Sequence, residues 1–124
     1  MRDFRFRAWV PNDIIEGRKG KIYPVIGLRW KPDQVEVEIW DDLRPLATLS
    51  IEYVKLMHFT GLQDKNGKEI YESDKLYNGG GITRTVHFKK LRGAWCAGEL
   101  RLDNQLASKL VVTGNVYEEA EYGK

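Results

Sequence analysis

Two groups of basic residues with nearby tryptophans are the part of this sequence whose residue types could do chemistry. Arg5 and Arg7 alternate along one predicted strand, just before Trp9. The second group follows His87 further along the chain. Basic side chains neutralise phosphates, and exposed aromatic rings stack on unpaired bases. The pattern therefore predicts one candidate function, nucleic-acid binding by a small β-barrel, through Arg5, Arg7, Lys89, Lys90, Arg92 and Trp95.

The alternative interpretation is that these basic residues form solvated strand faces and that the tryptophans belong to the core. The chain has 20 Lys and Arg against 18 Asp and Glu, a net charge of +2. A balance so close to neutrality does not by itself predict a polyanionic partner, so this alternative is favoured.

The charges are unevenly distributed along the chain. Residues 16–31 carry five basic and one acidic residue, residues 32–52 carry one basic and six acidic, and residues 82–102 carry five basic and one acidic. Opposite charges on adjacent strands stabilise a sheet, so we expect the first two segments to neutralise each other.

No residues stand at a spacing typical of a catalytic or metal site. His58 and His87 lie far apart, and neither has a second His or a Cys at a ligand-like offset. We expect Cys96 to be a buried, unreactive thiol. Gly79–Gly81 precede no Lys-Ser/Thr pair, so they do not form a phosphate-binding loop. The sequence predicts a protein that is not an enzyme and has no cofactor or metal.

A single cysteine is typical of a reducing compartment, so we expect a cytoplasmic protein. No apolar run near the first residue resembles a signal peptide, and none is long enough to cross a membrane. We therefore expect no membrane partner.

Alternation of apolar and polar residues predicts strands in the first half of the chain. One strand contains Phe4, Phe6 and Ala8. A second, at residues 22–26, contains Pro24 and is therefore predicted to be an edge strand or extended loop. Residues 35–39 form a third. Residues 46–57 fit a strand or a helix, and their β-branched content favours the strand.

The second half carries stronger turn signals. Asn66-Gly67 favours a type I′ hairpin turn, since both residues tolerate positive φ. Gly79–Gly81 predict another turn before a strand at residues 82–88, and Gly93 begins a further turn and strand. Residues 103–108 suit one helical turn, and residues 111–117 form the last predicted strand. Short strands with frequent turns indicate a mainly β barrel or sandwich.

Three blocks in matching order resemble the YopX-like family of proteins, which are encoded mostly by bacteriophages and prophages. The central block, residues 56–74, reads LMHFTGLQDKNGKEIYESD, and it is long enough to be specific. The outer blocks are FRAW at residues 6–9 and GNVYE at residues 114–118. The sequence departs from the family pattern at Ser73, where Gly is usual, and at Lys75, where an apolar residue is usual.

The resemblance implies a small SH3-like, partly open barrel in the C-terminal half, from about residue 59 to 124. Additional N-terminal strands, about residues 1–58, would pack on it or extend it within a single domain of residues 1–124. It also implies a prophage accessory protein that self-associates. It supplies no activity and no residue roles.

The central block is predicted to act mainly in folding. Gly61 and Asn66-Gly67 suit special backbone conformations, Ile70 and Tyr71 suit anchors in the core, and Asp74 suits an acceptor of backbone N–H groups. The alternative is a recognition surface formed with Glu69 and Glu72. The block's distinctive residues are Phe59, Thr60, Gly61, Leu62, Asp64, Asn66, Gly67, Ile70, Tyr71 and Asp74.

The leading hypothesis for function is therefore a non-enzymatic protein that binds an unidentified phage or host protein, or assembles into a homo-oligomer. The nucleic-acid-binding barrel is the second hypothesis.

Overall fold

The structure is a computed structural model that describes residues 5–122. Its internal contacts divide the chain into an N-terminal unit that ends at His58 and a C-terminal unit that begins at Phe59. Most of the ordered elements are antiparallel strands, so the predicted mainly β class is confirmed. Phe4, which the sequence places in the first strand, lies outside the described residues. Whether the two units form one domain stays a prediction.

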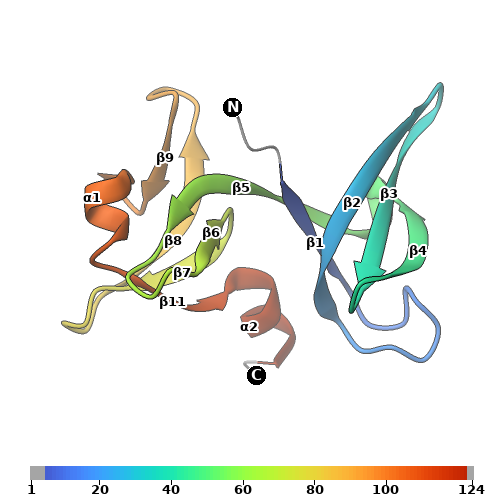
Figure 1. Ribbon diagram of the computed structural model, residues 1–124, viewed down its shortest axis with the longest axis horizontal. Coiled ribbons are helices and arrows are strands. Elements are labelled where there is room, and N and C mark those ends of the chain that lie inside the picture. The colour runs from blue at the N-terminus through green and yellow to red at the C-terminus, as the bar shows by residue number, and fades with distance from the viewer. Residues whose placement is uncertain (1–4, 123–124) are drawn as a thin grey trace. The chain divides into compact units, whose positions relative to one another are not determined.

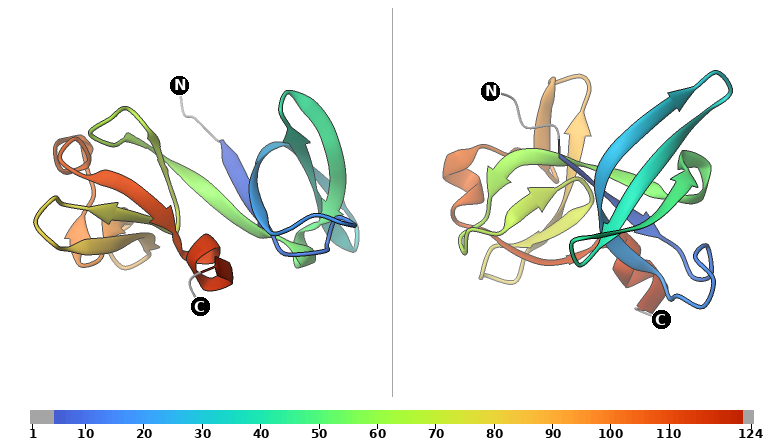
Figure 2. Two further views of the ribbon diagram at one scale, coloured as in Figure 1. Left: turned by 90° about the horizontal axis from the view of Figure 1, so that it is seen from below. Right: turned by 45° about the vertical axis from the view of Figure 1, so that its right-hand side comes forward.

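The N-terminal unit is a sheet whose strands follow one another almost in chain order (Figure 1). They are β1 (Phe6–Val10), β2 (Lys21–Lys31), β3 (Gln34–Asp41), β4 (Arg44–Ser50) and the first half of β5 (Lys55–Gln63), in the spatial order β4-β3-β2-β1-β5. A short 3₁₀ helix, η1 (Ile51–Tyr53), separates β4 from β5. The tip of the β2–β3 hairpin extends past β4 (Figures 1 and 2), because β4 pairs with β3 only from Glu36 onward.

Alternation along these strands builds the core of the N-terminal unit. Val37 and Ile39 of β3 are fully buried and Val35 is half-buried, whereas Arg29 and Thr48 on the opposite face are exposed. The buried residues of this core are Ala8, Val10, Tyr23, Val37, Ile39 and Val54. At roughly 1.5–3 kcal/mol for each large apolar side chain, this burial is the main favourable term for the unit.

Two predictions for this half were wrong in detail. β2 is an interior strand, with β1 on one side and β3 on the other. However, Pro24 lies opposite Arg7 of β1, and pairing with β3 begins only at Val25, so the missing N–H disrupts no second ladder. The strand predicted over residues 46–57 is interrupted by η1, where the hydroxyl of Ser50 accepts a hydrogen bond from the backbone N–H of Glu52.

Ion pairs join the basic and acidic segments of the N-terminal unit, as expected. Arg18 lies 2.8 Å from Asp41, and Lys31 lies 3.1 Å from Glu36. A hydrogen bond from the Arg18 guanidinium is the main cause that holds the pKa of the half-buried Asp41 carboxyl below its usual range. The segments of opposite charge therefore meet within one chain.

The C-terminal unit contains shorter strands and two helices. After the second half of β5 come β6 (Glu69–Tyr71), β7 (Asp74–Tyr77), β8 (Thr83–Lys89), β9 (Ala94–Ala97), β10 (Leu100–Arg101), α1 (Asn104–Ala107), β11 (Val111–Asn115) and α2 (Val116–Tyr122). β6 pairs with β5, and the other strands form a sheet of order β10-β9-β8-β7-β11. Neither sheet closes into a barrel within residues 5–122, and the SH3-like detail is not confirmed.

The core of the C-terminal unit draws on nearly all of its elements. Its buried residues are Ile70, Leu76, Val86, Ala97, Leu102, Ala107 and Leu110. The helical turn expected near residues 103–108 is present, and the carboxylate of Asp103 caps it by accepting from the N–H of Leu106. The last strand ends at Asn115 rather than Tyr117, because residues 116–122 form α2.

The hairpin at Asn66-Gly67 is present, but its predicted turn type was wrong. A type I′ turn needs a positive φ at both residues. Only Gly67 has one, at 80°, and Asn66 has a negative φ. The N–H of Gly67 donates to the carbonyl of Asp64, and the N–H of Asp64 donates to the carbonyl of Lys68. This is a type I turn followed by a left-handed glycine. A type I′ loop instead joins β3 to β4, at Asp42 (φ 48°) and Leu43 (φ 67°).

Candidate functional site

The β8–β9 hairpin brings together most of the second basic and aromatic group. Phe88 lies opposite Trp95 across the two strands, with ring centroids 5.3 Å apart in an edge-to-face arrangement. Trp95 is half-buried and packs on the core, whereas Phe88 remains 45% exposed. Phe88 is therefore the aromatic side chain that this hairpin offers to a partner, although the sequence interpretation chose Trp95.

Glu99 engages two of the three basic residues of the hairpin, one through its carboxylate and one through its backbone carbonyl. Lys89 Nζ lies 2.7 Å from Glu99 Oε2, and Arg92 Nη1 donates to the backbone carbonyl of Glu99 at 2.8 Å. The hydrogen bond from Lys89 is the main cause that lowers the pKa of Glu99. Lys90 is exposed and forms no ion pair among the described residues. The cluster thus presents less free positive charge than its sequence suggests.

Exposed apolar side chains surround these basic residues. Leu91 in the turn is fully exposed, and Leu100 of β10 is exposed beside them. Leu100 pairs with Ala97, so it lies on the same face of the sheet as Trp95 and Phe88. We call Phe88, Lys90, Leu91, Arg92 and Leu100 the hairpin surface. The sequence analysis identified its basic members and missed the apolar ones, because isolated exposed apolar residues carry no periodic signal.

Arg5, Arg7 and Trp9 lie in the N-terminal unit. Arg5 is exposed, whereas Arg7 is half-buried in the middle of β1, with Pro24 and Met57 as its neighbours on β2 and β5. Trp9 is buried against Gly20, where a Cβ would lie 2.6 Å from the indole ring. Trp9 is therefore a core residue and cannot stack on a base.

Asp64 of the family block ties the β5–β6 turn to β11. Its Oδ1 accepts hydrogen bonds from the N–H groups of Asn66 and Lys68, and its Oδ2 accepts from that of Val112. Burial raises the pKa of Asp64, but the hydrogen bonds from Val112, Lys68 and Asn66 outweigh this effect and leave the pKa below its ordinary value.

Asp74 makes a second link of the same kind. Its Oδ2 accepts from the N–H of Tyr71 at 2.8 Å, and its Oδ1 accepts from the side-chain amide of Asn115 at 3.0 Å. Asn115 in turn accepts from the N–H of Tyr117, at the start of α2. Both side chains are 1% exposed. Asn115 belongs to the closing GNVYE block, and no local pattern in the sequence predicts its bond to Asp74.

The other residues of the family block also have structural surroundings. Thr60 donates to the carbonyl of Ile70 at 2.7 Å, Ile70 is fully buried, and the rings of Phe59 and Tyr71 lie 5.3 Å apart. Leu62 packs on the core. Gly61 has φ of 84°. These contacts favour the folding interpretation of the block over a recognition surface.

His87 and Cys96 have surroundings typical of structural residues. His87 Nε2 lies 2.9 Å from the carbonyl of Gly98, and Cys96 is fully buried. The part of the chain that the structure describes contains no group of three or more His, Cys, Asp or Glu side chains suited to a metal ion.

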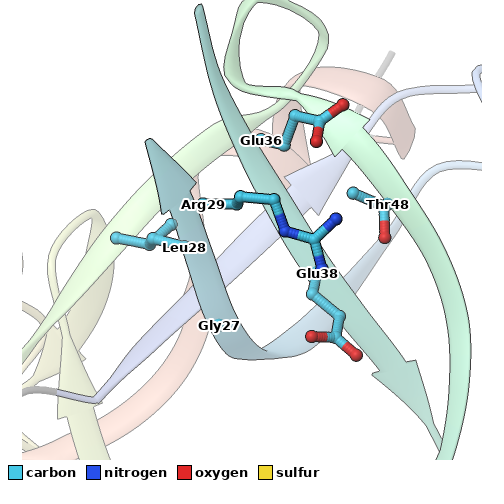
Figure 3. Close-up of a pocket in the computed structure, with 6 residues that line it drawn as sticks. All are labelled: Gly27, Leu28, Arg29, Glu36, Glu38 and Thr48. Carbon is cyan, nitrogen blue, oxygen red and sulfur yellow. The ribbon is translucent and has the colours of Figure 1, made fainter. Parts of the chain in front are cut away.

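A shallow hollow of about 170 Å³ lies on the polar face of the N-terminal sheet (Figure 3). Its floor is open because Gly27 has no side chain at a bulge in β2. The Arg29 guanidinium lies between the carboxylates of Glu36 and Glu38, with Thr48 of β4 beyond them. Glu36 is paired with Lys31, and Glu38 accepts a hydrogen bond from Trp40. The hollow is the size of one side chain.

A model of the family described as YopX protein matches residues 5–122. Among solved structures, the chain is similar to the crystal structure of protein EF1440 from Enterococcus faecalis, at 19% identity and a TM-score of 0.57, with 100% of each chain covered. At this identity the likeness shows the fold alone. No curated protein matches the sequence. Within residues 5–122, no helix has the length and apolar character that a membrane crossing requires.

Proposed function

The chain belongs to the YopX family, and from this premise we propose that it is a non-enzymatic, phage- or prophage-encoded protein that binds another protein in the bacterial cytoplasm. The binding site is the hairpin surface of the C-terminal unit. The observation that carries the proposal is the exposure of three large apolar side chains on adjacent strands and the turn between two of them, Phe88 on β8, Leu91 in the β8–β9 turn and Leu100 on β10. Large exposed apolar side chains grouped in this way are typical of sites that become buried when a partner protein binds.

Charge indicates the kind of partner. Residues 82–102 carry five basic residues and one acidic residue, Glu99, which already contacts Lys89 and Arg92. Lys90 and Arg92 flank the fully exposed Leu91. A protein segment with an apolar anchor and an acidic neighbour complements this surface, because its anchor covers Leu91 while its carboxylate meets Lys90, the flanking cation that Glu99 does not engage.

Nucleic-acid binding is the second candidate, favoured by the exposed Phe88 ring beside Lys90. It is weaker because Glu99 engages Lys89 and Arg92, and because Trp95 packs on the core. Phosphate neutralisation needs free cations, and stacking needs an open ring face.

A photo-crosslinking side chain at position 91 tests the first proposal. In lysate from phage-infected or lysogenic host cells, we expect one crosslinked protein, competed away by excess wild-type chain and not by the Leu91→Glu variant. The matched control places the same group at Ile82, which is exposed at another turn of the same unit. Equal products from both positions, or none from position 91, would sink the proposal. Salt-sensitive binding of labelled DNA or RNA that the triple variant Lys89→Ala, Lys90→Ala and Arg92→Ala loses would favour the second candidate instead.

A further inference from the structure

The second half of β2 has a neighbouring strand on one side only. β1 pairs with β2 from Lys21 to Val25, whereas β3 pairs with β2 as far as Lys31. In the described part of the chain, residues 26–31 therefore have β3 on one side and no strand on the other. We call this stretch the open edge of β2. Alternate residues of an antiparallel strand direct their N–H and C=O groups to opposite sides, so the open edge presents backbone groups that can pair with a further strand.

Apolar surface lies beside the open edge. A hollow of about 200 Å³ is lined by Phe6 of β1 and by residues 25–28 of β2. Ile26 is 54% exposed and Trp30 is 77% exposed. Leu28 packs on the core, and alternation places Trp30 on the same face of the strand. A strand laid along the open edge would put one apolar side chain in the hollow, and the next one on that face would cover the Trp30 ring.

The opposite face of the open edge carries positive charge. Lys31 is paired with Glu36. Arg29 is exposed and lies between the carboxylates of Glu36 and Glu38 (Figure 3), but it forms no ion pair in the part of the chain that the structure describes. Charged side chains on an edge discourage pairing with an arbitrary strand. A strand that brings an acidic residue opposite Arg29 turns this obstacle into a favourable cross-strand pair.

The occupied side of β2 shows which sequence complements this stretch. β3 places a Val-Glu-Val triplet, residues 35–37, opposite residues 28–30 of β2. Side chains project above and below a sheet and not along it, so a strand offers the same side chains to the neighbours on its two sides. The open side therefore fits the same order of apolar, acidic and apolar residues. The order reads the same in both directions, so either direction of the added strand satisfies it.

We propose that the open edge of β2 binds an extended segment of another protein in which an acidic residue lies between two apolar residues. The segment adds a strand beside β2. Its acidic side chain faces Arg29, one apolar side chain fills the hollow, and the other packs on Trp30. Backbone pairing supplies affinity in this mode of recognition, and alternate side chains supply specificity. In a second copy of this chain, residues 35–37 are already paired in their own sheet, so the partner is a different protein.

Two labelled peptides test the proposal by fluorescence anisotropy with the whole chain. The first, QVEVEI, has the sequence of residues 34–39, and the second, QVKVKI, replaces both glutamates by lysine. We expect the wild-type chain to bind the acidic peptide about tenfold more tightly than the basic one, because Arg29 attracts the first and repels the second. Arg29→Glu should reverse this preference. Trp30→Ala leaves the charges unchanged and should weaken both peptides about tenfold.

Controls locate the binding site. Arg44→Glu reverses an exposed arginine on β4 of the same unit, and Leu91→Glu changes the hairpin surface of the other unit. Both variants should bind the acidic peptide as the wild type does, so this site is tested independently of the hairpin surface. The acidic peptide should slow hydrogen exchange at amides of residues 26–31 and leave those of β4 unchanged.

Four results overturn the proposal. They are equal binding of the two peptides by the wild-type chain, binding of neither peptide at its highest soluble concentration, protection confined to β4, and a wild-type dimer that protects residues 26–31 without peptide. An Arg29→Glu variant that folds and still prefers the acidic peptide also contradicts it. If that variant fails to fold, Trp30→Ala decides, because unchanged binding by Trp30→Ala excludes the open edge as the site.

Discussion

The two units of this chain differ in what is buried inside them. The core of the N-terminal unit is formed by apolar side chains on strands that neighbour each other in sequence. The C-terminal unit adds Asp64, Asp74 and Asn115, which are the buried polar residues among those described. Asp64 reaches a backbone group 48 residues away, and Asp74 reaches a side chain 41 residues away.

The difference follows from topology. In the N-terminal unit, the loop of residues 11–20 joins β1 to β2, and short hairpin turns join β2 to β3 and β3 to β4, so each strand lies beside its neighbour in sequence and alternation favours one register. In the C-terminal unit, β11 must return to pair with β7 after four intervening elements. Buried hydrogen bonds with fixed geometry select one position for β11, whereas apolar contacts tolerate several. The family block supplies one end of both links, and β11 supplies the other at Val112 and Asn115.

The largest expected effect comes from removing the link at Asp74. Asp74→Ala leaves the Tyr71 N–H and the Asn115 amide without their acceptor, and we expect a loss of about 3 kcal/mol in the free energy of unfolding of the C-terminal unit. Hydrogen exchange measures this loss in each unit separately. Amides of β7 and β11 should lose about a hundredfold in protection, while those of β2 and β3 keep theirs.

The control for this experiment is Asp33→Ala, which removes the same carboxylate from the exposed turn between β2 and β3. We expect no change there beyond about 0.5 kcal/mol. If Asp74→Ala instead lowers hydrogen-exchange protection equally in both units, the two units unfold together. The buried polar links would then stabilise both units and not the C-terminal unit alone.

The second effect is the pH dependence that Asp64 confers. Because its folded-state pKa lies below the usual 3.8, ionised Asp64 stabilises the fold above that pH, and the contribution is lost as pH falls through the lower folded-state value. Asp64→Asn should cost about 2 kcal/mol at neutral pH, since an amide N–H then faces that of Val112. Urea unfolding at several pH values checks this. A variant whose stability falls as steeply below pH 4 as the wild type's would contradict it.

This comparison also explains how far the sequence could predict the structure. Period-two alternation located β3, and the turn residues located the loops at Asn66-Gly67 and Gly79–Gly81, because both signals are local. The type I′ turn at Asp42-Leu43 was missed, since leucine carries no signal for positive φ. The sequence suggested that Asp74 bonds backbone N–H groups, which the Tyr71 contact confirms. Its partner Asn115 could not be found, because nothing local links residues 41 positions apart.

At the hairpin surface, too, the sequence predicts which residues are present but not which contacts they make. The cluster of Lys89, Lys90 and Arg92 is visible in the sequence. Whether Lys89 and Arg92 are free to bind a partner depends on the position of Glu99, which follows two turns of the chain. The fate of Trp95 likewise depends on its register with Phe88 and on the core beneath it.

A smaller change in the free energy of unfolding, this time a gain in stability, is expected from replacing Ser73. The residue has φ of 73°, a conformation that glycine adopts without strain. Its backbone is fixed from both sides, by the carbonyl of Val86 and the N–H of Val116. Ser73→Gly relieves the strain and should stabilise the C-terminal unit by about 1 kcal/mol, measured by urea unfolding. Ser50→Gly is the matched control, and there we expect a loss, because Ser50 caps η1 with an extended backbone. A destabilising Ser73→Gly would contradict the strain.

The smallest expected change in the free energy of unfolding comes from a surface ion pair of the N-terminal unit. It tests whether surface charge stabilises this unit as buried polar groups stabilise the C-terminal unit. Glu36 and Lys31 lie 3.1 Å apart near the tip of the β2–β3 hairpin, and the lysine is well exposed. We expect Glu36→Ala to cost at most about 0.5 kcal/mol at low salt, because solvent screens the pair and both side chains lose freedom in forming it. The cost should vanish near 1 M salt, where the screening length falls to about 3 Å.

Urea unfolding at both salt concentrations measures this cost, with Glu16→Ala in the loop before β2 as the control. A loss that persists in high salt would mean that this ion pair helps to set the register of the hairpin, and the N-terminal unit would then depend on polar links as the C-terminal unit does.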